Sequence, residues 1–233
     1  MIMKRRAAFV MAAVLLIPVA AGCSEPPPTD PQALNYYDPA NRSFFKPVQY
    51  GASALEAEHY KTLKGAAQAT SAIIIAEVID VHPGSNTEDE AGDVTRYIAI
   101  DIRPIEVIKG SLPDQYRDQI TVERLAMRDV GRMVSRMRSN STDGLSVWFL
   151  RDKANYTRRM KRREPTGKEK KLPAYRLICS QGLFAQGKNG VMNPLIGHDW
   201  GMADEGESYD QLSELVNYLH SVEGWTGKAP RPE

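Results

Sequence analysis

The chain has 233 residues, of which 42% are hydrophobic and 25% are charged, and its formal net charge is +1. This composition is typical of an ordinary globular protein and excludes a disordered chain. The length predicts one moderate domain with additional segments.

The first 22 residues are predicted to be a signal peptide. Three basic residues at positions 4–6 precede an apolar run over residues 7–21, which is too short for a spanning helix. Removing this segment takes away three of the 30 basic residues and none of the 29 acidic ones, so the mature chain carries a net charge of −2. Such a balance argues against a nucleic-acid-binding protein.

The signal ends in the sequence Val-Ala-Ala-Gly-Cys, at residues 19–23. This resembles the bacterial lipoprotein signal, although Ala20 stands where that signal usually has Leu. The resemblance implies export, lipidation of Cys23 and a membrane anchor. Ser24 after the cysteine implies the periplasmic face of the outer membrane if the source is Gram-negative. The alternative is an ordinary secretory signal cut near Ala21, with Cys23 a free thiol.

Residues 23–50 are predicted to join this anchor to the domain. Their first part, to Pro39, is rich in proline and polar residues and predicts an extended tether. The aromatic residues of positions 35–50 either pack onto the domain or form an exposed site for a partner.

Two long strands around a polar loop form the predicted centre of a single β-rich domain, residues 51–226. The first strand begins at Ala72, its first half is apolar on both faces, and Pro83 and the residues after it are expected to end it. The second begins near Val94, and its apolar phase changes at Arg103-Pro104, which predicts a bulge that bends the strand.

Other elements are predicted around this pair. Cys179 is expected to be a buried thiol on the face of Tyr175 and Leu177. The expected elements are a helix over 53–69, strands over 119–124, 145–151 and 174–180, an irregular stretch over 127–144, a hairpin over 182–193, a helix after a capping box of Ser208 and Gln211, and a frayed tail over 227–233.

Four segments carry a resemblance to known domains, over roughly residues 55–195. They are AIIIAEVIDV, IDIRPIEVIKG, SVWFL and YRLICSQGLF. Their order resembles a broad class of exported bacterial domains of unassigned function, and the layout is similar to the small OB-like barrel of netrin-type modules. The predicted fold class is therefore mainly β (α+β), either an OB-like barrel or a strongly bent antiparallel sheet, with one helix before it and one after. The chain lacks the disulfide-linked N-terminal Cys through which metalloproteinase inhibitors of that type act, so no activity is carried over.

The segment over residues 151–171 has an unusual charge, with ten basic and three acidic residues. It is either a solvated insertion or a contact for an anionic envelope lipid, a polysaccharide or an acidic protein. Near an anionic surface each basic residue contributes about 1 kcal/mol. The candidate ligand-binding residues are Arg158, Arg159, Lys161, Arg162 and Arg163.

The sequence predicts no cofactor or metal site, because its four histidines lack metal-ligand spacing and the acidic loop of Asp89, Glu90 and Asp93 lacks EF-hand spacing. The first hypothesis is therefore a lipid-anchored, non-catalytic binding or assembly module of the cell envelope. The alternative is an envelope hydrolase or metal-dependent enzyme centred on His198 and Asp199, since an Asp can orient an imidazole.

Overall fold

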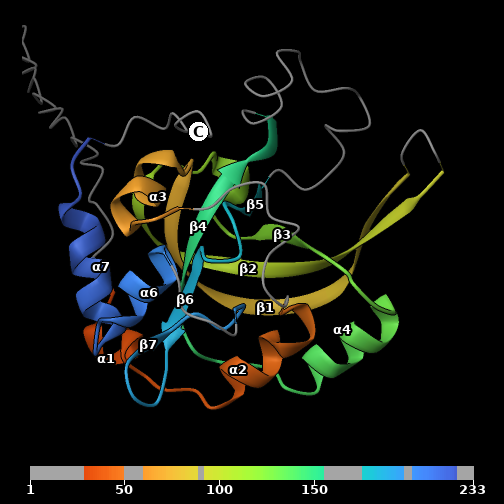
Figure 1. Cartoon of the computed structure of the whole chain (residues 1–233), viewed down its shortest axis with the longest axis horizontal. Helices are drawn as coiled ribbons and strands as arrows, with labels where there is room; N and C mark the ends of the chain where they lie inside the picture. Colours follow the sequence, from red (N-terminus) through yellow and green to blue (C-terminus); the bar gives the residue numbers. More distant parts are fainter. Residues whose placement is uncertain (1–28, 50–59, 89–91, 155–174, 197–200, 225–233) are drawn as a thin grey trace, which may run out of the picture.

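The computed structural model describes residues 29–49, 60–88, 92–154, 175–196 and 201–224 (Figure 1). Their architecture is a mixed α+β fold, mostly β, as the sequence predicted. The strands are β1 (Ala72–Glu88), β2 (Val94–Gly110), β3 (Ile120–Leu125), β4 (Ser146–Asp152), β5 (Tyr175–Leu177), β6 (Leu183–Gln186) and β7 (Val191–Met192). The helices are α1 (Pro31–Leu34), α2 (Ala40–Phe45), α3 (Leu63–Ala69), α4 (Val130–Arg138), α6 (Met202–Glu207) and α7 (Leu212–Ser221), with 3-10 turns η1 (Lys46–Val48) and η2 (Asp114–Tyr116).

The strand pairings lead from β1 through β2, β3, β5 and β4 and back to β1. All of these pairs are antiparallel except β3 with β5, which is parallel and consists of the single pair Val122 and Tyr175. The ring of strand pairings is therefore uneven, because the link between β3 and β5 is a single residue pair whereas the other links are longer. The predicted hairpin is present as β6 and β7, and it extends the sheet from β4.

The first strand is longer than predicted, because β1 continues through Pro83 to Glu88. The register shifts between Pro83 and Asn86, so the proline, which lacks an N–H group, stands at an irregularity rather than in the regular ladder. An added Cβ at Gly84 would come within 3.0 Å of the Tyr97 carbonyl, which explains why a glycine fits there.

A bulge lies one residue from its predicted position. Ala76 pairs with Pro104 and Ile75 with Glu106, so Ile105 is the extra residue. A second shift leaves Ile108 between the partners of Ile73 and Ile74. These irregularities leave the Ile105 side of β2 open to solvent, with Ile105 41% and Val107 39% exposed.

Strands β1 and β4 lie between two hydrophobic cores, as the apolar character of both faces of the first long strand predicted. Ile74 and Trp148 belong to the first core, whereas their neighbours Ile73 and Phe149 belong to the second. All four side chains are fully buried. The first core is enclosed by β2, β3 and α4, and the second is covered by α3 and α7 (Figure 1).

The prediction of an irregular stretch over 127–144 was wrong, because it contains α4. The side chain of Asp129 caps this helix by accepting a hydrogen bond from Arg132 N at 2.7 Å. Met133, Val134 and Met137 are buried in the first core, at a spacing that fits one helical face.

The expectation of one helix before the sheet and one after was also incomplete. Helix α3 begins at Leu63, capped by Thr62, while Ser53 and Glu56 lie outside the described residues. The capping box of α7 is formed by Gln211 and Glu214, one turn later than predicted.

Residues 29–49, assigned from the sequence to the tether and aromatic segment, form α1, α2 and η1. Leu34, Phe44 and Phe45 are buried, so the apolar members of this stretch pack onto the domain. Tyr36 and Tyr37 remain 56% and 40% exposed.

Cys179 is a buried thiol, but it is not on the face of Tyr175 and Leu177. Strand β5 ends at Leu177, and the turn that follows carries Cys179 into the second core, whereas the other two side chains lie in the first.

Candidate functional site

The residues proposed from the sequence as site candidates lie outside the described part of the chain. They are Cys23, Arg158, Arg159, Lys161, Arg162, Arg163, His198 and Asp199. Of the acidic loop, only Asp93 is described. The structure does describe the first four residues of the basic segment and several polar clusters that the sequence did not reveal.

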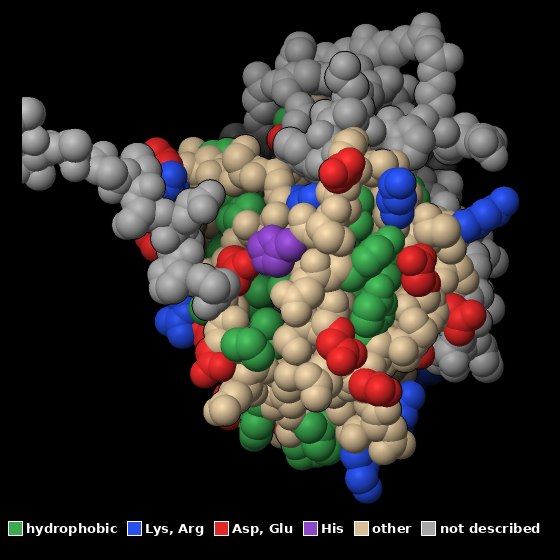
Figure 2. All heavy atoms as spheres, turned by 90° about the vertical axis from the view of Figure 1, so that its left-hand side faces the viewer, with side chains coloured by type: hydrophobic (Ala, Val, Ile, Leu, Met, Phe, Trp, Pro, Cys, Tyr) green, Lys and Arg blue, Asp and Glu red, His purple; other side chains and the backbone are tan. Residues whose placement is uncertain are grey.

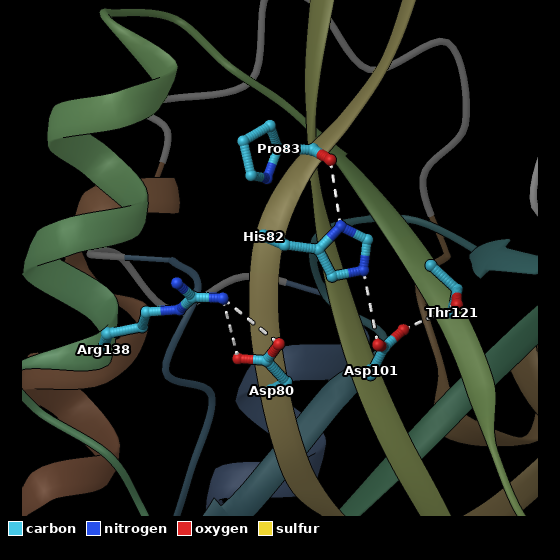
Figure 3. A network of polar contacts seen from close by, with 6 residues as sticks. All are labelled: Asp80, His82, Pro83, Asp101, Thr121 and Arg138. Atoms are coloured by element: carbon cyan, nitrogen blue, oxygen red, sulfur yellow. Dashed lines mark hydrogen bonds and ion pairs between the residues drawn. The ribbon is translucent and has the colours of Figure 1, made fainter.

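The most site-like cluster lies across β1, β2 and β3 (Figure 3). The register places His82 beside Ala99 and Asp101 beside Thr121. Asp101 Oδ2 lies 3.3 Å from His82 Nε2, and Thr121 Oγ1 donates a 2.6 Å hydrogen bond to Asp101 Oδ1. This arrangement resembles part of a catalytic triad, in which a carboxylate orients an imidazole.

The other nitrogen of His82 decides what this pair can do. His82 Nδ1 lies 3.0 Å from the carbonyl oxygen of Pro83, so both ring nitrogens face acceptors. A neutral imidazole has one N–H, and only the imidazolium donates to both oxygens. In this geometry neither nitrogen faces a nucleophile, and the His82–Asp101 pair acts as a cross-strand polar contact on a half-exposed surface.

A neighbouring ion pair joins α4 to β1. Arg138 Nη2 lies 3.2 Å from both carboxylate oxygens of Asp80, and Figure 3 shows the arginine reaching across from the helix. Both side chains are about half exposed, so the pair contributes at most about 1 kcal/mol to stability.

A buried carboxylate lies where the basic segment begins. The Glu123 side chain is only 2% exposed and lies 2.8 Å from Lys153 Nζ, while Ser85 N donates to its other oxygen at 2.7 Å. Burial acts to raise the pKa of Glu123, but the hydrogen bonds from Lys153 and Ser85 outweigh it and lower the pKa. Lys153, the second basic residue of the segment, is thereby held against β3.

The start of the basic segment has two further attachments. Arg151 is 4% exposed and donates to Tyr60 Oη at 2.8 Å, and Asp152 N donates to Ser71 Oγ at 3.0 Å. On the far side of the segment, Tyr175 pairs with Val122 of β3 and Asp152 of β4. The chain is therefore fixed to the sheet at the start of the segment and again at Tyr175, four residues after its end.

A second buried carboxylate, Asp38, fastens the N-terminal helices to the loop before β4. Asp38 accepts hydrogen bonds from Thr142 Oγ1 at 2.6 Å, Ala40 N at 2.8 Å and Asp143 N at 2.9 Å. Burial acts to raise the pKa of Asp38, and these hydrogen bonds outweigh it and lower the pKa. Every contact is internal, so this cluster is structural.

A third carboxylate, Glu106, receives the first residue that the structure describes. Thr29 donates to Glu106 Oε2 from its backbone N at 2.7 Å and from Oγ1 at 2.6 Å, while His220 Nε2 lies 2.9 Å from Oε1. Burial acts to raise the pKa of Glu106, but the hydrogen bonds from Thr29 and His220 outweigh it and lower the pKa. Strand β2 and helix α7 are thus joined to the N-terminal segment at this point.

A groove of about 720 Å³ lies beside Glu106, between the outer side of β2 and the end of α7. Ile105, Val107 and Leu112 supply apolar walls, while Arg117 and His220 supply polar ones. Figure 2 views the molecule from the α7 side and shows hydrophobic side chains exposed among acidic and basic ones. This open, partly apolar groove is suited to a contact with another surface rather than to enclosing a small molecule.

A second groove, of about 560 Å³, lies between the N-terminal helices, the β6–β7 turn and α6. Its charged lining residues, Arg42, Lys188, Asp204 and Glu207, have both signs. Glu207 Oε1 accepts a 2.5 Å hydrogen bond from Asn193 N, so this carboxylate has a structural role.

The alternation along β2 is enough to place Asp101 on the face opposite Ile100 and Ile102, but it does not reveal the partners of Asp101. Contact with His82 depends on a register that shifts at four places along the β1–β2 pair. Among the described residues no group of three His, Cys, Asp or Glu side chains is arranged to hold a metal ion, and no helix is long and apolar enough to cross a membrane.

Comparisons with protein-family models, with curated proteins and with solved structures found no match.

Proposed function

We propose that this chain is a lipid-anchored envelope protein whose β-rich domain is a small OB-like barrel and a non-catalytic binding module. In this proposal Cys23 is lipidated after export, and in a Gram-negative host it anchors the domain at the periplasmic face of the outer membrane. The basic segment over 151–171 contacts an anionic partner of the envelope: a lipid, a polysaccharide or an acidic protein.

The barrel is supported by the circuit of strand pairings. The order β1-β2-β3-β5-β4, with β4 returning to β1, is a route that a small closed barrel takes, and the bulges supply the bending that closure requires. Helix α4, between β3 and β4, packs its methionines into the core that the circuit surrounds.

One observation carries the binding proposal: a segment of net charge +7 lies between β4 and β5, two strands that pair with each other. In OB folds the connection between the fourth and fifth strands borders the binding face. The Lys153–Glu123 and Arg151–Tyr60 contacts hold the first residues of the segment in the folded protein. Binding a partner there therefore does not cost the conformational entropy of ordering these residues.

The test is vesicle binding by the mature chain with Cys23 replaced by Ser. Binding to anionic vesicles and not to neutral ones is expected, and it should weaken steeply as salt rises. A variant with Arg158, Arg159, Lys161, Arg162 and Arg163 changed to Gln should lose most of this binding, at roughly 1 kcal/mol for each charge.

A matched control removes the same number of charges elsewhere. It changes the exposed residues Arg42, Arg128, Arg132, Arg136 and Lys188 to Gln. If the control loses as much binding as the test variant, the effect is one of net charge and the proposed contact is wrong.

Mass spectrometry of the native protein tests the anchor separately. It should show the acyl groups on Cys23, and an unmodified Cys23 would remove the anchor from the proposal.

A further inference from the structure

We infer that the groove between β2 and the end of α7 rests on the lipid bilayer, with Ile105, Val107 and Leu112 turned toward the lipid surface. The inference relies on the proposed anchor at Cys23. It goes further because it assigns the membrane-facing side of the domain.

The first step is the length of chain between the anchor and the domain. Thr29 is fixed to Glu106 by two hydrogen bonds, at 2.7 and 2.6 Å. Only six residue steps separate it from Cys23. Even fully extended, six residues span about 20 Å, so Glu106 lies within about that distance of the bilayer surface.

The second step compares this reach with the size of the domain. A compact domain of roughly 200 residues has a radius of gyration of about 16 Å, so its width is about twice the reach of the anchor. The domain cannot turn its far side to the bilayer while the Thr29–Glu106 contact holds. The half of the domain that carries Glu106 is therefore the half nearer the lipid.

The third step is the character of that surface. Ile105 and Val107 flank Glu106 and are 41% and 39% exposed, and both line the groove with Leu112. Isoleucine and valine exposed together on a strand, beside an anchor point, favour contact with the apolar boundary of a bilayer. The tether raises the effective concentration of lipid at this face, so even a weak contact is occupied.

The test uses the whole mature chain tethered by a route that does not depend on lipidation. A hexahistidine replaces residues 1–23 so that its last histidine directly precedes Ser24, and Cys179 is changed to Ala. The protein is bound to phosphatidylcholine vesicles that carry a nickel-chelating lipid, at about 0.5 M salt. The Debye length is then about 4 Å, so the contribution of the basic segment is screened.

An environment-sensitive fluorophore reports which face meets the lipid. It is attached in separate variants at Ile105→Cys, at Val107→Cys and, as a control, at Val94→Cys. Val94 is 45% exposed and lies at the far end of β2, roughly 40 Å along the strand from Glu106 (Figure 1). Circular dichroism checks that each labelled protein is folded.

On tethering, the labels at 105 and 107 should brighten at least about twofold and shift to the blue, while the label at 94 stays unchanged. Inserting about twenty Gly and Ser residues between Pro28 and Thr29 should remove most of the change, because the effective concentration falls. Equal responses at all three positions, or none at 105 and 107, would overturn the inference. Neither result would bear on the lipidation of Cys23, which mass spectrometry tests. The proposed anchor and the proposed membrane-facing groove can therefore fail independently.

Discussion

At the scale of single residues, three carboxylates in the domain act as hydrogen-bond acceptors, two of them buried and Glu106 partly buried. Asp38, Glu106 and Glu123 each receive two or more donors, and in each the hydrogen bonds outweigh burial and lower the pKa. A lowered pKa in the folded state stabilises the fold above the pKa of the unfolded chain. This stabilisation is lost as the pH falls through the folded-state value.

Asp38 gives the clearest test of this effect. Asp38→Asn keeps the shape of the side chain but removes the charge that Thr142 and two backbone N–H groups contact, so it should cost about 1–3 kcal/mol in the free energy of unfolding at pH 7. The difference between wild type and variant should shrink as the pH falls below about 4, the ordinary Asp pKa, toward the lowered value. Urea denaturation at several pH values measures it.

The control for this experiment is Asp114→Asn, because the Asp114 side chain is 90% exposed and pairs with an exposed arginine, Arg117. It should change stability by less than about 1 kcal/mol at every pH. A pH-independent cost of Asp38→Asn would show that the carboxylate charge has no role in this contact.

At the scale of elements, packing around α6 should reverse the usual effect on stability of replacing a helical glycine by alanine. Replacing a helical glycine by alanine usually stabilises a helix by roughly 0.5–1 kcal/mol. At Gly206, however, an added Cβ would lie 2.2 Å from Phe184 Cε1, a buried ring of the second core. Gly206→Ala should therefore destabilise the protein by about 1–3 kcal/mol.

Gly131, in the first turn of α4, is the matched control. Its added Cβ would meet only Asp129 Oδ1, at an ordinary 3.5 Å. Gly131→Ala should leave stability unchanged or raise it by up to about 1 kcal/mol. Thermal unfolding of both variants measures the contrast, and equal shifts for the two would contradict the argument from packing.

The elements also show what the sequence could and could not predict. The long central strands, the bulge near Pro104, the β6–β7 hairpin and α7 follow from local periodicity and turn residues. Helix α4 was missed because its two valines and two methionines are interrupted by arginines, and because its buried face is decided by the core that it meets. The His82–Asp101 and Thr29–Glu106 contacts join residues that are 19 and 77 positions apart, and no local pattern specifies such pairs.

At the scale of the whole molecule, the two cores share the same strands. Strands β1 and β4 each direct alternate side chains into the first core and into the second, so neither core can open while these strands stay ordered in the other. The domain should therefore unfold as one cooperative unit, although its two cores lie on opposite faces of the sheet.

Leu215 and Trp148 provide the test, because they lie in different cores. Leu215, on α7, is fully buried in the second core, and Trp148, on β4, is fully buried in the first. Leu215→Ala should cost about 2–5 kcal/mol. In a background with Trp200 and Trp225 changed to Phe, fluorescence follows Trp148 while far-UV circular dichroism follows the whole chain. If the cores are coupled, the substitution moves both transitions by the same amount; if the fluorescence midpoint stays in place while the dichroism midpoint falls, the cores unfold independently and the shared strands do not couple them.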